Sequence, residues 1–157
     1  MLSRYNGAIG VKTVFTKKSG RCLISAAKRD GLTLIAVTLN APDDWRDHTA
    51  LLDFGFEHFE RKTLFDTGEF YYDLPLSNAD VDFVRITNVS PITVLIRKGA
   101  STPSTAVECH FRFAVAPVKE GQILGRLCVS ADGKDYFSSL ICKAPINAKR
   151  KKHAIFN

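Results

Sequence analysis

Ser25 and Lys28 have a spacing that could support nucleophilic catalysis. In the first turn of a helix, residues three apart share a face, so the lysine could accept the proton of the serine hydroxyl. Here both residues lie in an apolar segment of strand character that runs into Asp30 and Gly31, a turn signal. An odd spacing in a strand sends two side chains to opposite faces. We therefore predict that Ser25 is not a nucleophile.

Lys12 and Thr13 are the second candidates, an ammonium and a hydroxyl on an apolar strand. A lysine and threonine pair is common in strands and carries little weight alone, so the flanking residues decide. Residues 7–28, with Val14 after the pair, resemble the Lys-Thr-Gly strand of penicillin-recognising serine enzymes. The resemblance continues through DGLTLIAVTLN at 30–40 and LLDFGF at 51–56. It narrows the family to the low-molecular-mass D-alanyl-D-alanine carboxypeptidases, which are also penicillin-binding proteins.

This resemblance implies roles for individual residues. Lys12 and Thr13 would bind the carboxylate of a peptidoglycan stem peptide, and the backbone N–H of Phe15 would belong to the oxyanion hole. Val14 stands where the family has glycine, which places a branched side chain at a crowded position. The implied reaction removes a terminal D-alanine through an acyl-serine intermediate without a cofactor.

The second half of the chain resembles the β-rich C-terminal domain of the same family. The resemblance rests on GEF at 68–70, PVKEGQILGR at 117–126 and DGK at 132–134. Because the chain begins only a few residues before the Lys-Thr strand, we expect the nucleophile-bearing segment to be absent and the isolated chain to be inactive. A non-catalytic envelope module that serves as a spacer or docking surface is the alternative.

The net charge of +6 comes mainly from the end of the chain. Four of the six excess positive charges lie in the tail: Lys149, Arg150, Lys151 and Lys152. Such a run is usually a solvated terminus, and the alternative is attraction to a membrane surface or an anionic wall polymer. Nucleic-acid binding is disfavoured because the charge does not lie on an aromatic-studded face.

Composition excludes further classes of protein. No run of about 18 apolar residues is present, and the first residues lack the apolar core of a signal peptide, although the resembled family is extracytoplasmic and membrane-associated. The histidines and cysteines show no metal-ligand spacing, so we predict no metal site and no cofactor. We expect the four cysteines to be small buried hydrophobes: Cys22, Cys109, Cys128 and Cys142.

The predicted fold class is α+β, with a remnant of the catalytic domain formed by residues 1–60. Strands are expected at 9–15, 22–27 and 32–39, the last apolar enough for a buried central position. Asp43 is expected to cap a helix with one face formed by Trp45, Leu52, Phe56 and Phe59. One helix covers one face of a sheet, so the other face and at least one strand edge should lie open.

Residues 61–146 are predicted to form a small antiparallel, sandwich-like β domain, followed by a basic tail at 147–157. Strands are expected at 63–65, 70–74, 81–87, 92–97, 107–115, 123–130 and 135–142. Alternation within 109–115 would place His110 and Arg112 on the solvent face, opposite Phe111 and Phe113. Four aromatic residues could form a ligand surface, but packing is the favoured interpretation: Trp45, on a helix face, is expected in the core, and Phe70, Tyr71 and Tyr72, in a strand, are expected to divide between core and surface.

Overall fold

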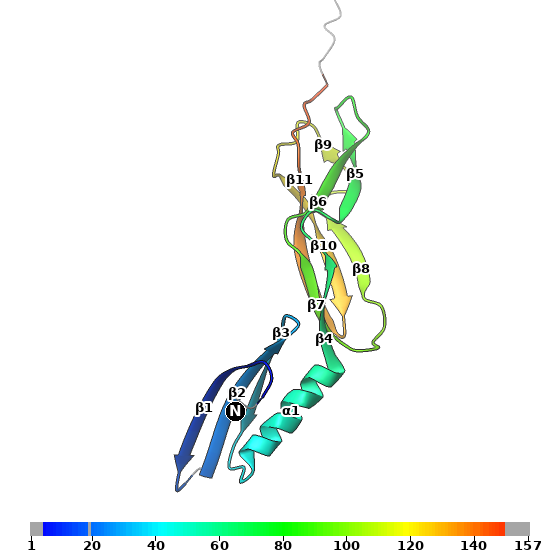
Figure 1. The fold of residues 1–157 in the computed structure, drawn as a ribbon. Helices are drawn as coiled ribbons and strands as arrows, with labels where there is room; N and C mark the ends of the chain where they lie inside the picture. Colours follow the sequence, from blue (N-terminus) through cyan, green and yellow to red (C-terminus); the bar gives the residue numbers. More distant parts are fainter. Residues whose placement is uncertain (1–4, 19, 150–157) are drawn as a thin grey trace, which may run out of the picture. The chain divides into compact units, whose positions relative to one another are not determined.

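A computed structural model describes residues 5–18 and 20–149, and Figure 1 shows the order of the elements. The chain divides into two compact units. The first contains the residues up to 62 together with 95–100, and the second contains 63–94 and the residues from 101 onward. The structure thus shows a mostly β protein with a single helix in its described residues.

The first unit contains a three-stranded antiparallel sheet in the order β1-β2-β3. The strands are β1 (Ala8–Thr16), β2 (Gly20–Arg29) and β3 (Leu32–Thr38). Asp30 and Gly31 both have positive φ angles, 48° and 76°, as a two-residue hairpin turn requires. Asn and Asp tolerate this conformation better than other side chains, and glycine adopts it freely. The turn predicted from Asp30 and Gly31 is therefore confirmed.

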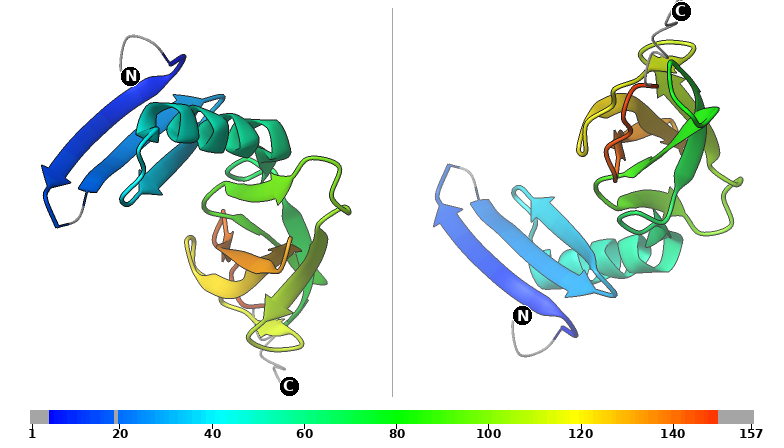
Figure 2. Two further views of the ribbon diagram at one scale, coloured as in Figure 1. Left: turned by 90° about the horizontal axis from the view of Figure 1, so that it is seen from below. Right: turned by 90° about the horizontal axis from the view of Figure 1, so that it is seen from above.

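Helix α1 (Asp44–His58) lies against one face of this sheet (Figure 2). Leu52 is buried in the core formed with Ala27 and Ala36. Gly55 permits the close approach, because a Cβ atom at this position would lie 2.4 Å from Cδ1 of Leu34. The helix face therefore needs a residue without a side chain where it crosses β3.

Three expectations about this helix are wrong. The Asp43 side chain makes no cap hydrogen bond; its backbone carbonyl accepts from the N–H groups of Arg46 and Asp47 instead. Trp45 is 40% exposed rather than in the core. Phe59 is not helical. Its backbone is extended, and it is the first residue of β4 (Phe59–Phe65). The helix face that is buried contains the polar residues Asp44 and His48, which the spacing of the apolar residues did not predict.

The predicted central position of residues 32–39 is also wrong. β3 forms an edge of the three-stranded sheet, while β2 is central. On the sheet face opposite α1, Ile24, Ile35 and Val37 are 46%, 69% and 54% exposed. The apolar character of β3 is real, but within the described residues only one of its faces is covered. The open face and open edge expected from a single helix are therefore present.

β4 and β7 (Ile92–Arg97) form a two-stranded sheet. The hydroxyl groups of Thr63 and Thr93 lie 3.0 Å apart on this ribbon. At its other end the Lys98 backbone N–H donates to the His58 carbonyl, and Lys98 Nζ donates to the Phe56 carbonyl at 2.9 Å. These two bonds attach residues 95–100 to the C-terminal end of α1 in the first unit.

The second unit is built on a six-stranded sheet in the order β8-β10-β11-β6-β5-β9, antiparallel except for the parallel pair β5 and β9. Its strands are β5 (Tyr71–Ser77), β6 (Phe83–Asn88), β8 (Ser104–Cys109), β9 (Ala114–Val115), β10 (Ile123–Ala131) and β11 (Lys134–Cys142). Asp132 and Gly133 form the hairpin turn between β10 and β11 with φ angles of 47° and 74°.

Asn88 organises the loop that enters this sheet. It is buried, and its side-chain amide donates to the carbonyls of Asp66 and Ser90 while its Oδ1 accepts from the Phe70 N–H. Its backbone carbonyl accepts from Gly68. A buried amide that satisfies all of these groups fixes the loop that runs from residue 66 to 70 into β5.

The continuous strand predicted at 107–115 does not form. β8 ends at Cys109, and β9 takes up only Ala114 and Val115, which pair with β5 rather than with β10. Phe111, Phe113 and Val115 are exposed, not on a shared buried face. The alternating pattern was correct for a strand, but the chain changes partner within it.

Candidate functional site

The structure places Lys12 and Thr13 on adjacent positions of β1, at the edge of the three-stranded sheet. Lys12 is opposite Ile24 and Thr13 is opposite Leu23 on β2. Neighbouring positions in a strand face opposite ways, so Lys12 projects from the face away from α1 and Thr13 from the face that α1 partly covers. Both residues are exposed. No strand pairs with the outer edge of β1 among the described residues.

Val14 and Phe15 follow on the same strand and are also exposed. Val14 is opposite Cys22 and shares the face of Lys12, while Phe15 is opposite Arg21 and shares the face of Thr13. A cation, a hydroxyl and an open strand edge suit the binding of an extended chain that bears a carboxylate.

Ser25 does not meet Lys28. Ser25 is 1% exposed and its Oγ lies 2.5 Å from Nδ1 of His48, whereas Lys28 is exposed on the other face of β2. Nε2 of His48 in turn lies 3.0 Å from Oγ1 of Thr38. Both ring nitrogens therefore have hydroxyl partners, and a substrate has no access to a serine at this depth. The prediction that Ser25 and Lys28 lie on opposite faces is confirmed.

The buried contact between Ser25, His48 and Thr38 holds α1 on the sheet. Burial of the imidazole lowers the pKa of His48, because the charged form would lose its hydration, and Asp44 opposes this shift only in part. His48 is fully buried. A neutral ring that donates from one nitrogen and accepts at the other satisfies both hydroxyl groups.

Asp44 begins the helix with a second buried polar contact. Its carboxylate is nearly fully buried and accepts two hydrogen bonds from Arg21, from Nε at 3.1 Å and Nη2 at 2.9 Å. This bidentate pair ties the N-terminus of α1 to the beginning of β2. A signal for both contacts was present in the sequence: Asp44 and His48 are four residues apart, so they share a helix face, and both are polar.

Tyr5 makes a third polar contact near the other end of the helix. Its hydroxyl donates to Oδ1 of Asp53 at 2.7 Å, and the guanidinium of Arg29 lies over the rings of Tyr5 and Phe56. Burial and the neighbouring carboxylate raise the pKa of Tyr5 to about 12. These contacts hold Tyr5, which precedes β1, against α1.

The remaining candidates do not gather into a site. Phe70 is half-buried and packs edge to face against Phe65, while Tyr71 and Tyr72 are both exposed on β5. The core position expected of Trp45 is wrong. Cys128 and Cys142 are buried as expected, but Cys22 and Cys109 are only half-buried. In the parts of the chain that the structure describes, no group of histidine, cysteine or acidic residues could hold a metal ion.

The tail has one described basic residue. Nζ of Lys149 lies 3.8 Å from Asp80, and its backbone N–H donates to the Asn78 carbonyl. The other three residues of the predicted basic surface, Arg150, Lys151 and Lys152, lie outside the described residues. No described helix is long and apolar enough to span a membrane.

Residues 59–153 match the family model for the C-terminal domain of penicillin-binding protein 5. The chain belongs to this family. It is 28% identical over 153 residues to the D-alanyl-D-alanine carboxypeptidase DacF of Bacillus subtilis, and this match covers 95% of the chain and 38% of the relative. DacA of Haemophilus influenzae, another D-alanyl-D-alanine carboxypeptidase, is 27% identical over 83% of the chain and 34% of its own length.

Solved structures show the same fold. Penicillin-binding protein 5 of Haemophilus influenzae has a TM-score of 0.65 at 24% identity, with 88% of this chain and 43% of that chain covered. The carboxypeptidase DacD of Francisella tularensis has a TM-score of 0.66 at 23% identity, with 94% of this chain and 38% of that chain covered. The chain thus spans less than half the length of these relatives. The resemblance to penicillin-binding carboxypeptidases is confirmed. The matches to the Bacillus subtilis relative and to the Francisella tularensis structure also extend into the residues before 59.

Proposed function

We propose that this chain is the C-terminal part of a serine-type D-Ala-D-Ala carboxypeptidase that acts in cell-wall peptidoglycan metabolism outside the cytoplasm. The observation that carries this proposal is the match to the Bacillus subtilis carboxypeptidase over 95% of the chain, which includes β1 with Lys12 and Thr13. In this proposal residues 1–60 are the end of the catalytic domain and residues 61–146 are the β-rich C-terminal domain.

We assign the substrate carboxylate to Lys12 and Thr13. The geometry that supports this role is the open edge of β1, where a peptide can lie alongside the strand. The two exposed side chains leave β1 on opposite faces, so both would reach the carboxylate around this edge. The Phe15 backbone N–H would stabilise the oxyanion that forms on the scissile carbonyl. Val14 does not block the edge, because its side chain points away from the sheet plane and is about half exposed.

We expect the isolated chain to be inactive. The pair with the spacing of a serine nucleophile and its lysine base, Ser25 and Lys28, is separated by the sheet, and Ser25 is buried. Incubation with a labelled penicillin followed by intact-mass spectrometry should show no covalent adduct. A stoichiometric adduct on any serine would contradict this expectation.

The roles of Lys12 and Thr13 can be tested in a chimera. The chain is joined to the N-terminal part of the Bacillus subtilis relative in place of that protein's own C-terminal part, and release of D-alanine from a D-Ala-D-Ala peptide is measured. Lys12→Ala should lower kcat/KM by about 100-fold or more, because a preorganised charge at the substrate is lost. Lys17→Ala, an exposed lysine beyond the end of β1, is the matched control and should leave kcat/KM unchanged. Equal effects of the two variants would contradict the assignment.

The alternative is a non-catalytic envelope module. Its support is that the second unit has its own buried core around β6, β10 and β11 and could act as a spacer without the first unit. The chimera distinguishes the two proposals, since a spacer would tolerate Lys12→Ala.

A further inference from the structure

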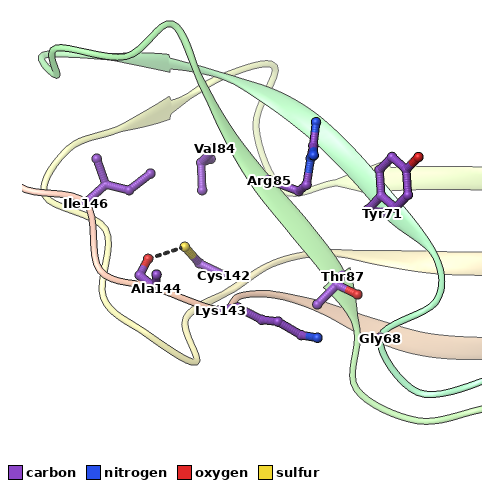
Figure 3. Close-up of a pocket in the computed structure, with 9 residues that line it drawn as sticks. All are labelled: Gly68, Tyr71, Val84, Arg85, Thr87, Cys142, Lys143, Ala144 and Ile146. Atoms are coloured by element: carbon purple, nitrogen blue, oxygen red, sulfur yellow. Dashed lines mark hydrogen bonds between the residues drawn. The ribbon is translucent and has the colours of Figure 1, made fainter.

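The second unit contains a groove beside β6 with a cavity of about 360 Å³ (Figure 3). The groove exists because two neighbouring strands separate. β11 pairs with β6 through Cys142 and Ile86, and after Cys142 the chain leaves the sheet. The Cys142 thiol donates to the Ala144 carbonyl at this departure. Toward its start, β6 is therefore paired with β5 on one side and faces the groove on the other.

Hydrogen bonds already made show which backbone groups face the groove. The Leu76 N–H donates to the Asp82 carbonyl, and backbone groups of alternate strand residues point to the same side. Val84 and Ile86 therefore direct their backbone groups toward β5, and Phe83 and Arg85 direct theirs toward the groove. A strand edge with N–H and C=O groups available can add an extended peptide as a further strand.

The groove is apolar at one end and cationic at the other. Val84, Ala144 and Ile146 lie together at one end in Figure 3, and Lys143 extends toward Gly68 and Thr87 at the other. A second hollow that shares Arg85 and Ile146 continues the groove toward Phe83 and Asp80. An elongated shape of this kind suits a peptide of several residues.

Arg85 forms a fixed wall of the groove. Its guanidinium donates to both carboxylate oxygens of Asp73, at 2.7 and 2.8 Å, and lies 5.0 Å from the centre of the Tyr71 ring. Its charge is therefore already matched by a carboxylate. Lys143 differs, because among the described residues no carboxylate lies within ion-pair distance of its ammonium group.

Gly68 makes room for this ammonium group. A Cβ atom at residue 68 would lie 2.7 Å from Nζ of Lys143, and the φ angle of +77° also disfavours any other residue. The backbone of the loop thus leaves the Lys143 head group beside the cavity.

We propose that this groove binds an extended peptide that carries a carboxylate side chain. The peptide backbone pairs with the free edge of β6, its carboxylate meets Lys143, and an aliphatic side chain two residues away, which faces the same side, packs on Ile146. This inference concerns the second unit alone and does not depend on the carboxypeptidase proposal.

The test is a titration of the full ¹⁵N-labelled chain with acetyl-Val-Ala-Glu-Ala-Val-amide, in which each valine lies two residues from the glutamate, monitored by amide chemical shifts. Saturable shifts should centre on Arg85, Thr87 and Lys143. The matched peptide with glutamine in place of glutamate should bind at least about tenfold more weakly, because a charge-assisted hydrogen bond is lost. Absence of saturable shifts at millimolar peptide, or equal affinity for the two peptides, would overturn the proposal.

Variants locate the site. Lys143→Ala should lower the affinity for the glutamate peptide to that for the glutamine peptide. Lys134→Ala, which removes an exposed lysine at the other end of β11, should leave the affinity unchanged. Ala144→Leu should block the groove, and Asp73→Asn should tighten binding because it releases the guanidinium of Arg85. All four positions are exposed, and the dispersion of the amide spectrum checks that each variant is folded. If neither Lys143→Ala nor Ala144→Leu changed the affinity, the peptide would bind elsewhere and this site would be refuted.

Discussion

The two compact units differ in how completely their β-sheets are covered. In the second unit, β6, β10 and β11 place side chains such as Ile86, Leu127 and Leu140 in a core from which water is fully excluded. In the first unit, one helix covers one face of three strands, and the opposite face leaves Ile24, Ile35 and Val37 in contact with water. A unit with one covered face has less buried apolar area to oppose the loss of chain entropy. We infer that the second unit is the more stable of the two.

The difference extends to the chemistry of the buried contacts. Across the interface between α1 and its sheet, the first unit relies on polar contacts of Ser25, His48 and Thr38 and on the ion pair between Arg21 and Asp44. Such contacts fix the position of the helix on the sheet. When one partner is removed, the other is left buried without a hydrogen bond, and this lowers the stability of the unit. The first unit should therefore respond to single polar substitutions and to pH more than the second.

Truncation in the core of the second unit should give the largest effect. Leu127→Ala is expected to lower its free energy of unfolding by about 2–5 kcal/mol, since a fully buried leucine leaves a cavity. Ile35→Ala on the open face of the first unit is the comparison and should change stability by about 0.5 kcal/mol or less. Hydrogen exchange measured segment by segment reports each unit separately. A large effect of Ile35→Ala would show that the open face is covered.

Loss of the Ser25 hydroxyl should be the next largest effect. Ser25→Ala leaves Nδ1 of His48 buried without its partner and should destabilise the first unit by about 1–3 kcal/mol. Trp45 is the single tryptophan and lies on α1, so its fluorescence during urea unfolding follows this unit. Ser101→Ala, at an exposed position, serves as the control and should be nearly neutral. An equally small effect of Ser25→Ala would mean that water replaces the hydroxyl.

Acidification should weaken the first unit selectively. Burial lowers the pKa of His48 below its usual value near 6.5, so between the folded and unfolded pKa values the unfolded chain binds more protons than the folded one. The free energy of unfolding therefore falls as the pH drops below about 6.5. His48→Gln should remove this dependence, and His110→Gln, at an exposed histidine, should retain it. The same pH dependence in His48→Gln would assign it to other groups.

Ile35→Ser should have the smallest effect on stability, but it should reduce self-association of the chain. Ile35→Ser should leave the folded first unit nearly as stable, but it interrupts the exposed apolar face formed with Ile24 and Val37. Because large exposed apolar patches promote association, we expect the unaltered chain to self-associate as its concentration rises and Ile35→Ser to do so less. Sedimentation velocity at several concentrations measures this. A wild-type chain that stays monomeric throughout would contradict it.

Local features of the fold were predictable because neighbouring residues decide them. Asp30 with Gly31 and Asp132 with Gly133 tolerate the positive φ angles of tight hairpins, and both turns formed. The strand at 92–97 was predicted with its observed ends, and its buried residues, Ile92, Val94 and Ile96, alternate with more exposed ones. The predicted opposite faces of Ser25 and Lys28 followed from strand geometry alone.

Partner choice was not predictable in the same way. Residues 107–115 have the alternation of one strand, yet the first part pairs with β10 and the last two residues pair with β5. Alternation specifies which side chains share a face and says nothing about which strand lies alongside. That Tyr71 and Tyr72 are both exposed was not predictable for a related reason, because the aromatic character of a strand does not say which of its side chains a neighbouring segment covers.

The sequence by itself determined the turns, the strand periods and, through the residues around Lys12 and Thr13, the family resemblance, because each depends on residues close together in the chain. Only the tertiary structure decided that His48 meets Ser25, 23 residues away, and that Lys143 stands beside a groove where β11 leaves β6. Those contacts depend on how α1 sits on its sheet and where two strands part, which are fixed by packing between distant segments.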